Sequence, residues 1–217
     1  MTAPSPDIVA DIPLPDSPLV RDITEFARDA LDELLFDHSR RVFYFGALQG
    51  RRRGLTPDPE LLYAAAMFHD LGLTSRYSRS STLRFEVDGA NAARDFLRQH
   101  GIDEARVRQV WLGIALHTTP GVPEFLEPEI ALVTAGVETD VLGIDRDALA
   151  PEAIAAVTAA HPRPDFKRRI LQAFADGMRN RPDTTFGTMN ADVLAHYDES
   201  FVRGDFVEII LNNGWPE

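Results

Sequence analysis

Four ionisable side chains stand where the helical periodicity of the sequence predicts a hydrophobic residue. They come from four separate apolar stripes: His38, His69, His117 and Asp140. A further carboxylate, Asp70, directly follows His69. Burying one carboxylate without a partner costs roughly several kcal/mol, so its place on an apolar stripe indicates a compensating charge. Because the four segments could converge in one core, we predict a shared partner there.

A divalent transition metal is the partner that suits this mixture of groups. Neutral imidazoles and carboxylates together bind Zn, Fe, Mn, Co or Ni, and the same ligand set serves each of these ions. His69 and Asp70 can reach one ion together at a helix end, and Gly72 predicts such an end. Taken singly, His38 also fits a buried core histidine and Asp140 a capping or ion-pairing residue. Taken together, the residues favour one metal site.

Helical periodicity covers nearly the whole chain and predicts an all-α helical bundle. Apolar residues recur at three- and four-residue steps, and capping residues, prolines and glycines give the boundaries. The expected helices lie at residues 23–35, 38–48, 58–72, 88–100, 103–117 and 128–141, with further helices from 151, from 165 and between 192 and 211. Residues 72–88 read as a polar loop. Three histidines receive structural roles only: His100, His161 and His196.

The chain of 217 residues predicts one domain with a sizeable core. Residues 1–16, where prolines cluster, predict an irregular N-terminal arm, and residues 17–217 a single helical domain without a flexible linker. The metal-site core falls at about 20–145. The additional C-terminal helices after it are expected to pack over the bundle. Gly187, Met189 and Asn190 are candidates to line a pocket there.

Composition limits the partners of the protein. The net charge of −12 repels nucleic-acid polymers and anionic membranes at long range, but permits a small-molecule substrate. No apolar run is long enough to span a bilayer, and the start does not resemble a signal peptide. We therefore expect a cytoplasmic protein with neither nucleic-acid nor membrane partners. The absence of cysteine excludes thiolate metal sites.

Three short motifs resemble the HD superfamily of metal-dependent hydrolases over about residues 20–145. They are His38-Ser39-Arg40-Arg41-Val42, His69-Asp70-Leu71-Gly72 and Asp140-Val141-Leu142-Gly143. Within that superfamily the chain is similar to cyanamide-hydratase-like proteins. The matching stretches are His69 to Thr74, Phe85-Glu86, and Ile114 to His117.

The resemblance assigns roles to individual residues. It implies an HD-type bundle whose metal ligands are His38, His69, Asp70 and Asp140. It implies that His117 lines the site and contacts substrate or water, and Glu86 is carried over as a second catalytic residue. Arg40, Thr74 and Arg84 are the predicted substrate-binding residues.

Three functions follow as hypotheses. The first is a metal-dependent hydrolase or hydratase that activates water toward a small polar molecule. The second is a phosphohydrolase of a nucleotide or phosphate ester, with the anion clamped by Arg40, Arg76, Arg79 and Arg84. Leu73, which stands where other branches of the superfamily have lysine or an acid, weakens this second hypothesis. The third is a non-catalytic sensor or scaffold with a structural metal.

Overall fold

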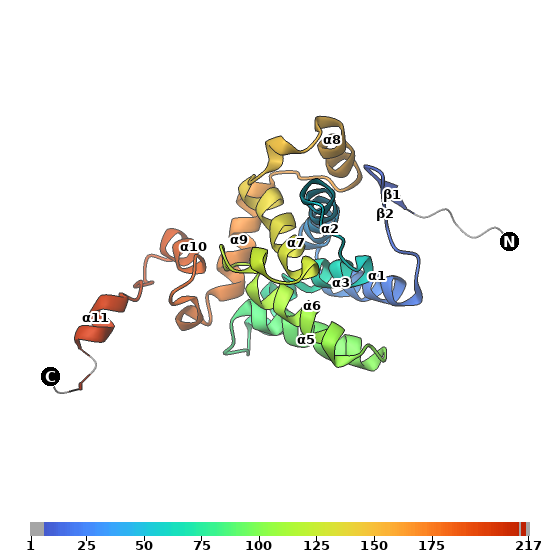
Figure 1. The fold of residues 1–217 in the computed structure, drawn as a ribbon. Helices are drawn as coiled ribbons and strands as arrows, with labels where there is room; N and C mark the ends of the chain where they lie inside the picture. Colours follow the sequence, from blue (N-terminus) through green and yellow to red (C-terminus); the bar gives the residue numbers. More distant parts are fainter. Residues whose placement is uncertain (1–6, 213, 216–217) are drawn as a thin grey trace.

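The computed structural model describes residues 7–212 and 214–215 and confirms an all-α protein (Figure 1). Its α-helices are α1 (Pro18–Ala30), α2 (Glu33–Arg53), α3 (Pro59–Phe68), α4 (Ser75–Ser78), α5 (Phe85–Gln99), α6 (Glu104–Leu116), α7 (Pro128–Val137), α8 (Pro151–Ala160), α9 (Phe166–Met178), α10 (Asn190–Tyr197) and α11 (Phe206–Leu211). The shorter turns are η1 (Leu71–Leu73), η2 (Pro123–Phe125), the π-helical η3 (Glu138–Leu142), η4 (Arg146–Ala148) and η5 (Pro182–Thr185). Among the described helices, none has the length and apolar character needed to cross a membrane.

The segment expected to be an irregular arm contains a small hairpin in its described part. Strands β1 (Ile8–Val9) and β2 (Ile12–Pro13) pair antiparallel. Ala10 and Asp11 join them with φ angles of 52° and 59°, as a two-residue type I′ turn requires. Val9 and Ile12 are buried, so the hairpin is anchored to the helical body. Residues 1–6 of the predicted arm lie outside the described residues.

Side-chain caps set the helix starts. The carboxylates of Asp58 and Asp103 accept backbone N–H groups of α3 and α6, as the sequence predicted. Ser17 and Asp32 cap α1 and α2 in the same way. The cap at Asp32 divides the apolar stripe that ran from residue 23 to His38 into two helices.

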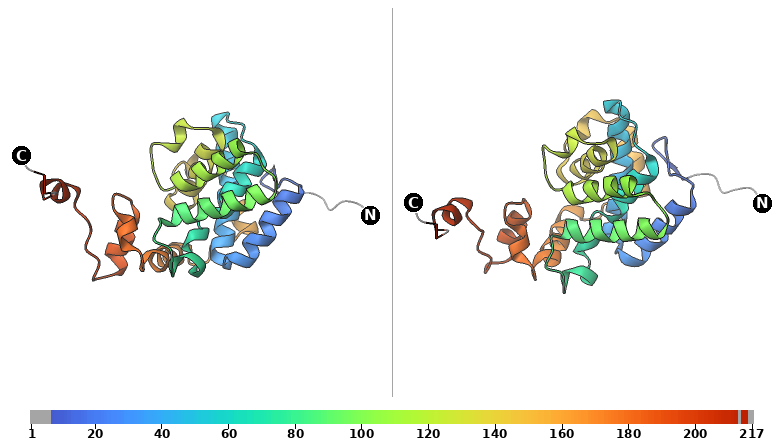
Figure 2. Two further views of the ribbon diagram at one scale, coloured as in Figure 1. Left: turned by 90° about the horizontal axis from the view of Figure 1, so that it is seen from below. Right: turned by 60° about the horizontal axis from the view of Figure 1, so that its bottom comes forward.

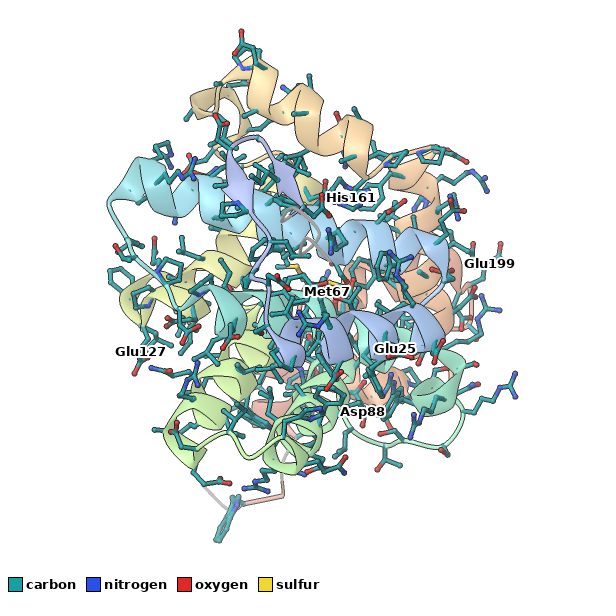
Figure 3. All side chains as sticks on the ribbon, turned by 90° about the vertical axis from the view of Figure 1, so that its right-hand side faces the viewer. Glu25, Met67, Asp88, Glu127, His161 and Glu199 are labelled. Carbon is teal, nitrogen blue, oxygen red and sulfur yellow. The ribbon has the colours of Figure 1, made fainter. Side chains whose placement is uncertain are left out.

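Helix α3 occupies the centre of the bundle and contacts α1, α2, α5, α6 and α7 (Figures 1 and 2). Every residue from Leu61 to Phe68 is buried, and in Figure 3 Met67 lies deep among the side chains while Glu127 and Glu199 lie at the outside. Helices α2 and α7 approach closely beside α3. A Cβ built on Gly136 would lie only 2.2 Å from the carbonyl oxygen of Val42. This tight crossing holds the middle of α2 against the end of α7.

Of the α-helices after residue 145, α8 and α9 pack on the bundle, α10 packs on α9, and α11 extends away. Helix α8 lies against α2, and α9 contacts α2 and η1. Helix α10 lies against α9, whereas α11 extends away from the bundle (Figures 1 and 2). The expected single periodic segment between 192 and 211 is therefore two helices separated by an extended stretch. The expected additional C-terminal helices are therefore present.

Candidate metal centre

Three of the predicted ligands meet in the core. The Nε2 atoms of His38 and His69 face each other at 3.1 Å. Asp70 Oδ2 lies 3.2 Å from His69 Nε2 and 3.5 Å from His38 Nε2. The three side chains are at most 1% exposed. Among the described residues, these three form the cluster whose donor atoms all lie within 4.8 Å of one another.

Local structure explains how adjacent residues reach one point. Helix α3 ends at Phe68, so His69 stands at its C-cap and Asp70 begins the 3₁₀ turn η1. The His69 ring donates Nδ1–H to the carbonyl oxygen of Ala66 at 2.7 Å. That hydrogen bond orients Nε2 toward the cluster. His69 and Asp70 therefore lie at a helix end, as the sequence predicted, and their donor atoms approach each other to 3.2 Å.

Asp140 fixes the tautomer of His38. Burial lowers the pKa of His38, and the hydrogen bond with Asp140 offsets only part of that effect. The neutral ring donates Nδ1–H to Asp140 Oδ2 at 2.7 Å, because the carboxylate can only accept. The His38 Nε2 lone pair therefore points into the cluster, as a metal ligand requires.

The imidazole of His38 separates Asp140 from the point where the three clustered residues meet. It is 3% exposed, and its Oδ1 accepts Arg41 Nε at 2.9 Å. Arg163 Nε lies 3.2 Å from the same oxygen. Burial raises the pKa of Asp140, but hydrogen bonding to His38 and the charge of Arg41 outweigh it and bring the pKa to about 2. Asp140 is thus an ionised partner of His38, and direct ligation by it remains a prediction.

Asp70 carries the strongest sign of a cation. Both of its oxygens are buried, and within the described part of the chain neither has a hydrogen-bond partner. Burial raises the pKa of Asp70, but the charge of His69 together with the interactions with His117 and His38 outweighs burial, so the carboxyl stays ionised. Burial lowers the pKa of His69, but the charge of Asp70 together with its other interactions with Asp70 and Ala66 outweighs burial, so the pKa lies above its ordinary value. A proton on His69 Nε2 and a metal ion would compete for this point, so the donor set of two imidazoles and one carboxylate fits a divalent ion.

His117 joins the cluster from α6. It is the C-cap of that helix and donates Nδ1–H to the carbonyl oxygen of Ile114 at 2.6 Å. Its Nε2 lies 3.7 Å from Asp70 Oδ1, and its ring meets the His69 ring edge-on with centroids 4.9 Å apart. His117 therefore lies beside the predicted ligands, as the sequence indicated.

Glu86 lies outside the cluster formed by His38, His69, Asp70 and His117. The side chain is fully buried and accepts hydrogen bonds from Thr118, from Arg84 at 2.8 Å and from Asn190 at 3.0 Å. Burial raises its pKa, but the hydrogen bond from Arg84 and the charge of His117 lower it below the ordinary value. The carboxylate is ionised and surrounded by donors, which suits it to hold other side chains in place.

The three predicted substrate-binding residues lie apart from one another. The Arg40 guanidinium donates to the hydroxyls of Tyr63 and Tyr44 at 3.1 and 3.2 Å. Thr74 donates its hydroxyl to the carbonyl oxygen of Leu71, and Arg84 is paired with Glu86. None of the three belongs to the described residues that line the cavity beside the metal centre.

That cavity has a volume of about 140 Å³. Its polar lining residues are His38, Asp70, His117, Thr118, Glu138 and Asn190. Its apolar walls include Val137, Val141, Leu171, Phe174, Met189 and Val193. The sequence-based candidates Met189 and Asn190 are confirmed as lining residues, whereas Gly187 lines a separate hollow.

Sequence reasoning missed Arg41 and the apolar walls. Arg41 stands three residues after His38, a spacing that puts both on one helix face, so its contact with Asp140 had a readable signal. Thr118 directly follows His117 and had the same kind of signal. Val193 and Phe174 had none, because only the tertiary arrangement of α9 and α10 brings them to the cavity.

Comparison with known proteins bears on the same residues. A family model described as the HD domain matches residues 35–174. The chain is also similar to two proteins of Saccharomyces cerevisiae, cyanamide hydratase DDI2 and cyanamide hydratase DDI3. Each is 27% identical to it over 157 residues, which cover 67% of this chain and 68% of the yeast protein. The family match contains the four predicted ligands and His117, and it ends before α10.

Proposed function

Because the chain belongs to the HD domain family, we propose that it is a metal-dependent hydratase or hydrolase that adds water to a small, uncharged polar molecule. The observation that carries this proposal is Asp70, an ionised, buried carboxylate without a hydrogen-bond partner among the described residues, next to two imidazole nitrogens. The yeast relatives named as cyanamide hydratases supply a candidate reaction. Cyanamide and water would combine to give urea.

We assign the metal to His38, His69 and Asp70, whose donor atoms face one point, and we assign the predicted fourth ligand, Asp140, to holding the His38 ring through Nδ1. A divalent ion bound there supplies a Lewis acid that lowers the pKa of water from 15.7 to about 7. The chain determines how strongly such an ion is held. Asp140 accepts Nδ1–H of His38 and so keeps His38 Nε2 unprotonated. The carbonyl oxygen of Ala66 accepts Nδ1–H of His69 and so orients that ring.

We assign proton transfer to His117. Its Nδ1–H is committed to the carbonyl oxygen of Ile114, so Nε2 is the ring atom available at the cavity. From there it can take a proton from water and return it to the substrate nitrogen. Glu86 is assigned to positioning, since its carboxylate holds Thr118 and Asn190, which line the same cavity.

Metal analysis tests the proposal first. The protein, purified without a nickel column, is expected to hold a divalent transition metal in plasma mass spectrometry. His69→Ala is expected to lose that metal, and His196→Ala, at an exposed position on α10, to keep it. Full metal content in His69→Ala would contradict the ligand assignment.

Hydration of cyanamide, followed as urea formation, tests the chemistry. His117→Ala is expected to retain the metal and to lower kcat by about 10²–10⁴-fold, the usual contribution of a general acid–base residue. A metal-loaded protein that hydrates no cyanamide or nitrile would contradict the proposal. Release of phosphate from a nucleoside monophosphate, lost in Asp70→Asn, would favour a phosphohydrolase instead.

A further inference from the structure

The cavity beside the metal centre combines a polar floor of site residues with walls that are mostly apolar. Eight of its fourteen lining residues are hydrophobic or proline. Six of them come from the end of α7, from η3, from α9 and from α10, while Pro120 lies in the turn after α6 and Met189 directly precedes α10. Binding pockets of this kind recognise a ligand by a few polar groups and bury its apolar part. The character of the walls therefore carries information about the substrate.

We propose, building on the proposed function, that the site takes an uncharged nitrile or cyanamide bearing a compact apolar substituent. Water would add across the carbon–nitrogen triple bond. The water oxygen bonds to the nitrile carbon, both hydrogens end on nitrogen, and R–C≡N becomes R–C(=O)–NH₂. The reaction needs no oxidant, reductant or further reactant.

The charges around the cavity exclude an anion. Its described lining residues include two carboxylates, Asp70 and Glu138, and no lysine or arginine. The arginines closest in the hydrogen-bond network are already engaged, Arg84 with Glu86 and Arg163 with Asp140. An anionic substrate would meet like charge without a compensating cation beyond the metal itself.

The size of the cavity exceeds what cyanamide needs. Its volume of about 140 Å³ is close to that of an engineered protein cavity of about 150 Å³ that binds benzene. Cyanamide has three non-hydrogen atoms and would leave most of the apolar wall without contacts, which forfeits dispersion energy. A substituent of a few carbon atoms would fill that space.

Glu86 determines how α10 contributes to the wall. Asn190, the first residue of α10, donates Nδ2–H to Glu86 Oε1 at 3.0 Å and so ties α10 to α5. Val193 follows three residues later on the same helix face and also lines the cavity. Helix α10 lies beyond residues 35–174, which the family model matches. Part of the wall that limits substrate size therefore comes from a segment outside the matched region.

Competition between substrates of different size and charge tests the inference. With the metal-loaded protein, kcat/KM is measured for cyanamide, N,N-dimethylcyanamide and the anionic cyanoacetate. We expect N,N-dimethylcyanamide to be preferred over cyanamide by about tenfold or more, as added methyl groups in an apolar pocket allow, and cyanoacetate to be inert. A preference for cyanamide or for cyanoacetate would overturn the inference.

Two variants of α10 locate the effect. Val193→Phe fills the cavity. It is expected to lower the ratio of kcat/KM for N,N-dimethylcyanamide to kcat/KM for cyanamide by about tenfold. Ala195→Phe, on the exposed side of the same helix, is expected to leave the ratio as in the wild type. An unchanged ratio in Val193→Phe would show that α10 does not select the substrate.

A binding measurement separates this inference from the proposed function. Butyronitrile is titrated into metal-free protein, and the methyl resonance of Met189 is followed by NMR. A shift in the wild type that is lost in Val193→Phe but kept in Ala195→Phe supports an apolar subsite, even if no substrate is hydrated. No shift in the wild type would overturn the subsite, even if cyanamide is hydrated.

Discussion

Gly72 lies where the backbone of η1 crosses the start of α5, and replacing it with alanine is expected to destabilise the protein at its metal centre. A Cβ built on Gly72 would lie 2.0 Å from the carbonyl oxygen of Phe85 and 2.8 Å from the carbonyl carbon. A carbon and a carbonyl oxygen in contact lie about 3.3–3.6 Å apart, so the two backbones must separate by more than about 1 Å.

The expected cost follows from the kind of obstacle. Overpacking a core costs about 1–3 kcal/mol, and more where side chains cannot turn aside. Both obstacles here are backbone, so we expect a loss of about 3 kcal/mol in the free energy of unfolding. For a chain of this length 1 kcal/mol corresponds to about 2–4 °C, which predicts a fall in Tm of about 6–12 °C.

Gly72→Ala should weaken the metal site as well as the fold. Asp70 lies two residues before Gly72, and Glu86 directly follows Phe85. The carbonyl oxygen of Gly72 also accepts a hydrogen bond from Arg181 at 2.6 Å. Separating the two segments therefore moves Asp70 relative to the wall behind it, and we expect a weaker affinity for the metal in the folded variant.

Gly113→Ala is the matched control. A Cβ at Gly113 would meet a Val133 methyl at 3.1 Å and other atoms at 3.6 Å or more, and helix α6 would gain about 0.8–1 kcal/mol in propensity. Scanning calorimetry and a Zn²⁺ titration of both variants provide the measurement. If Gly72→Ala melted within about 2 °C of Gly113→Ala and bound Zn²⁺ equally well, the crossing would not be as tight as described.

Three further outcomes follow from single contacts. Arg181 pairs with the buried Asp88 and donates to the carbonyl oxygen of Leu83, so Arg181→Ala is expected to lower the free energy of unfolding by about 3–5 kcal/mol in urea melts, because Asp88 is left unpaired. Burial raises the pKa of the Tyr44 phenol from 10.0 to about 12, so its contribution to stability is complete below pH 10 and is lost as pH rises toward 12; a stability–pH curve should decline less steeply in Tyr44→Phe. Removing the metal with a chelator should lower the free energy of unfolding by about 2.7 kcal/mol, compared with protein at a free metal concentration of about 100 times the Kd. The same treatment should have no such effect on His69→Ala.

Most of the helices could be predicted from the sequence because caps and apolar periodicity are local signals, although the expected polar loop at residues 72–88 contains most of η1, all of α4 and the first turn of α5. Asp58 and Asp103 are caps that act on the next three residues, so their effect can be read without the fold. His69 and Asp70 are adjacent, and their joint orientation needs only the end of one helix. Gly72 was predicted as a helix stop, but its φ is negative and what requires glycine there is the neighbouring backbone of Phe85.

Contacts across the chain were the part that could not be predicted. Arg40 and Arg41 are neighbours in sequence, yet Arg40 faces Tyr44 and Tyr63 while Arg41 reaches Asp140, 99 residues away. The helical spacing from His38 distinguishes the two, because a residue at i+3 shares the face and one at i+2 does not. The identity of the partner still requires the crossing of α2 and α7.

The turn that carries Asp140 is the clearest case of tertiary control. The stripe Val133, Val137 and Asp140 assumes a regular α-helix, but α7 ends at Val137 and the chain continues as the π-helix η3. A π turn holds more residues than an α turn, so positions within it are rotated away from where an α-helix would put them. Asp140 nevertheless lies inward, because His38 and Arg41 from α2 bind both of its oxygens. The Asp140 carboxylate is therefore held inward by its contacts with His38 and Arg41, and the pattern of apolar residues alone does not determine its direction.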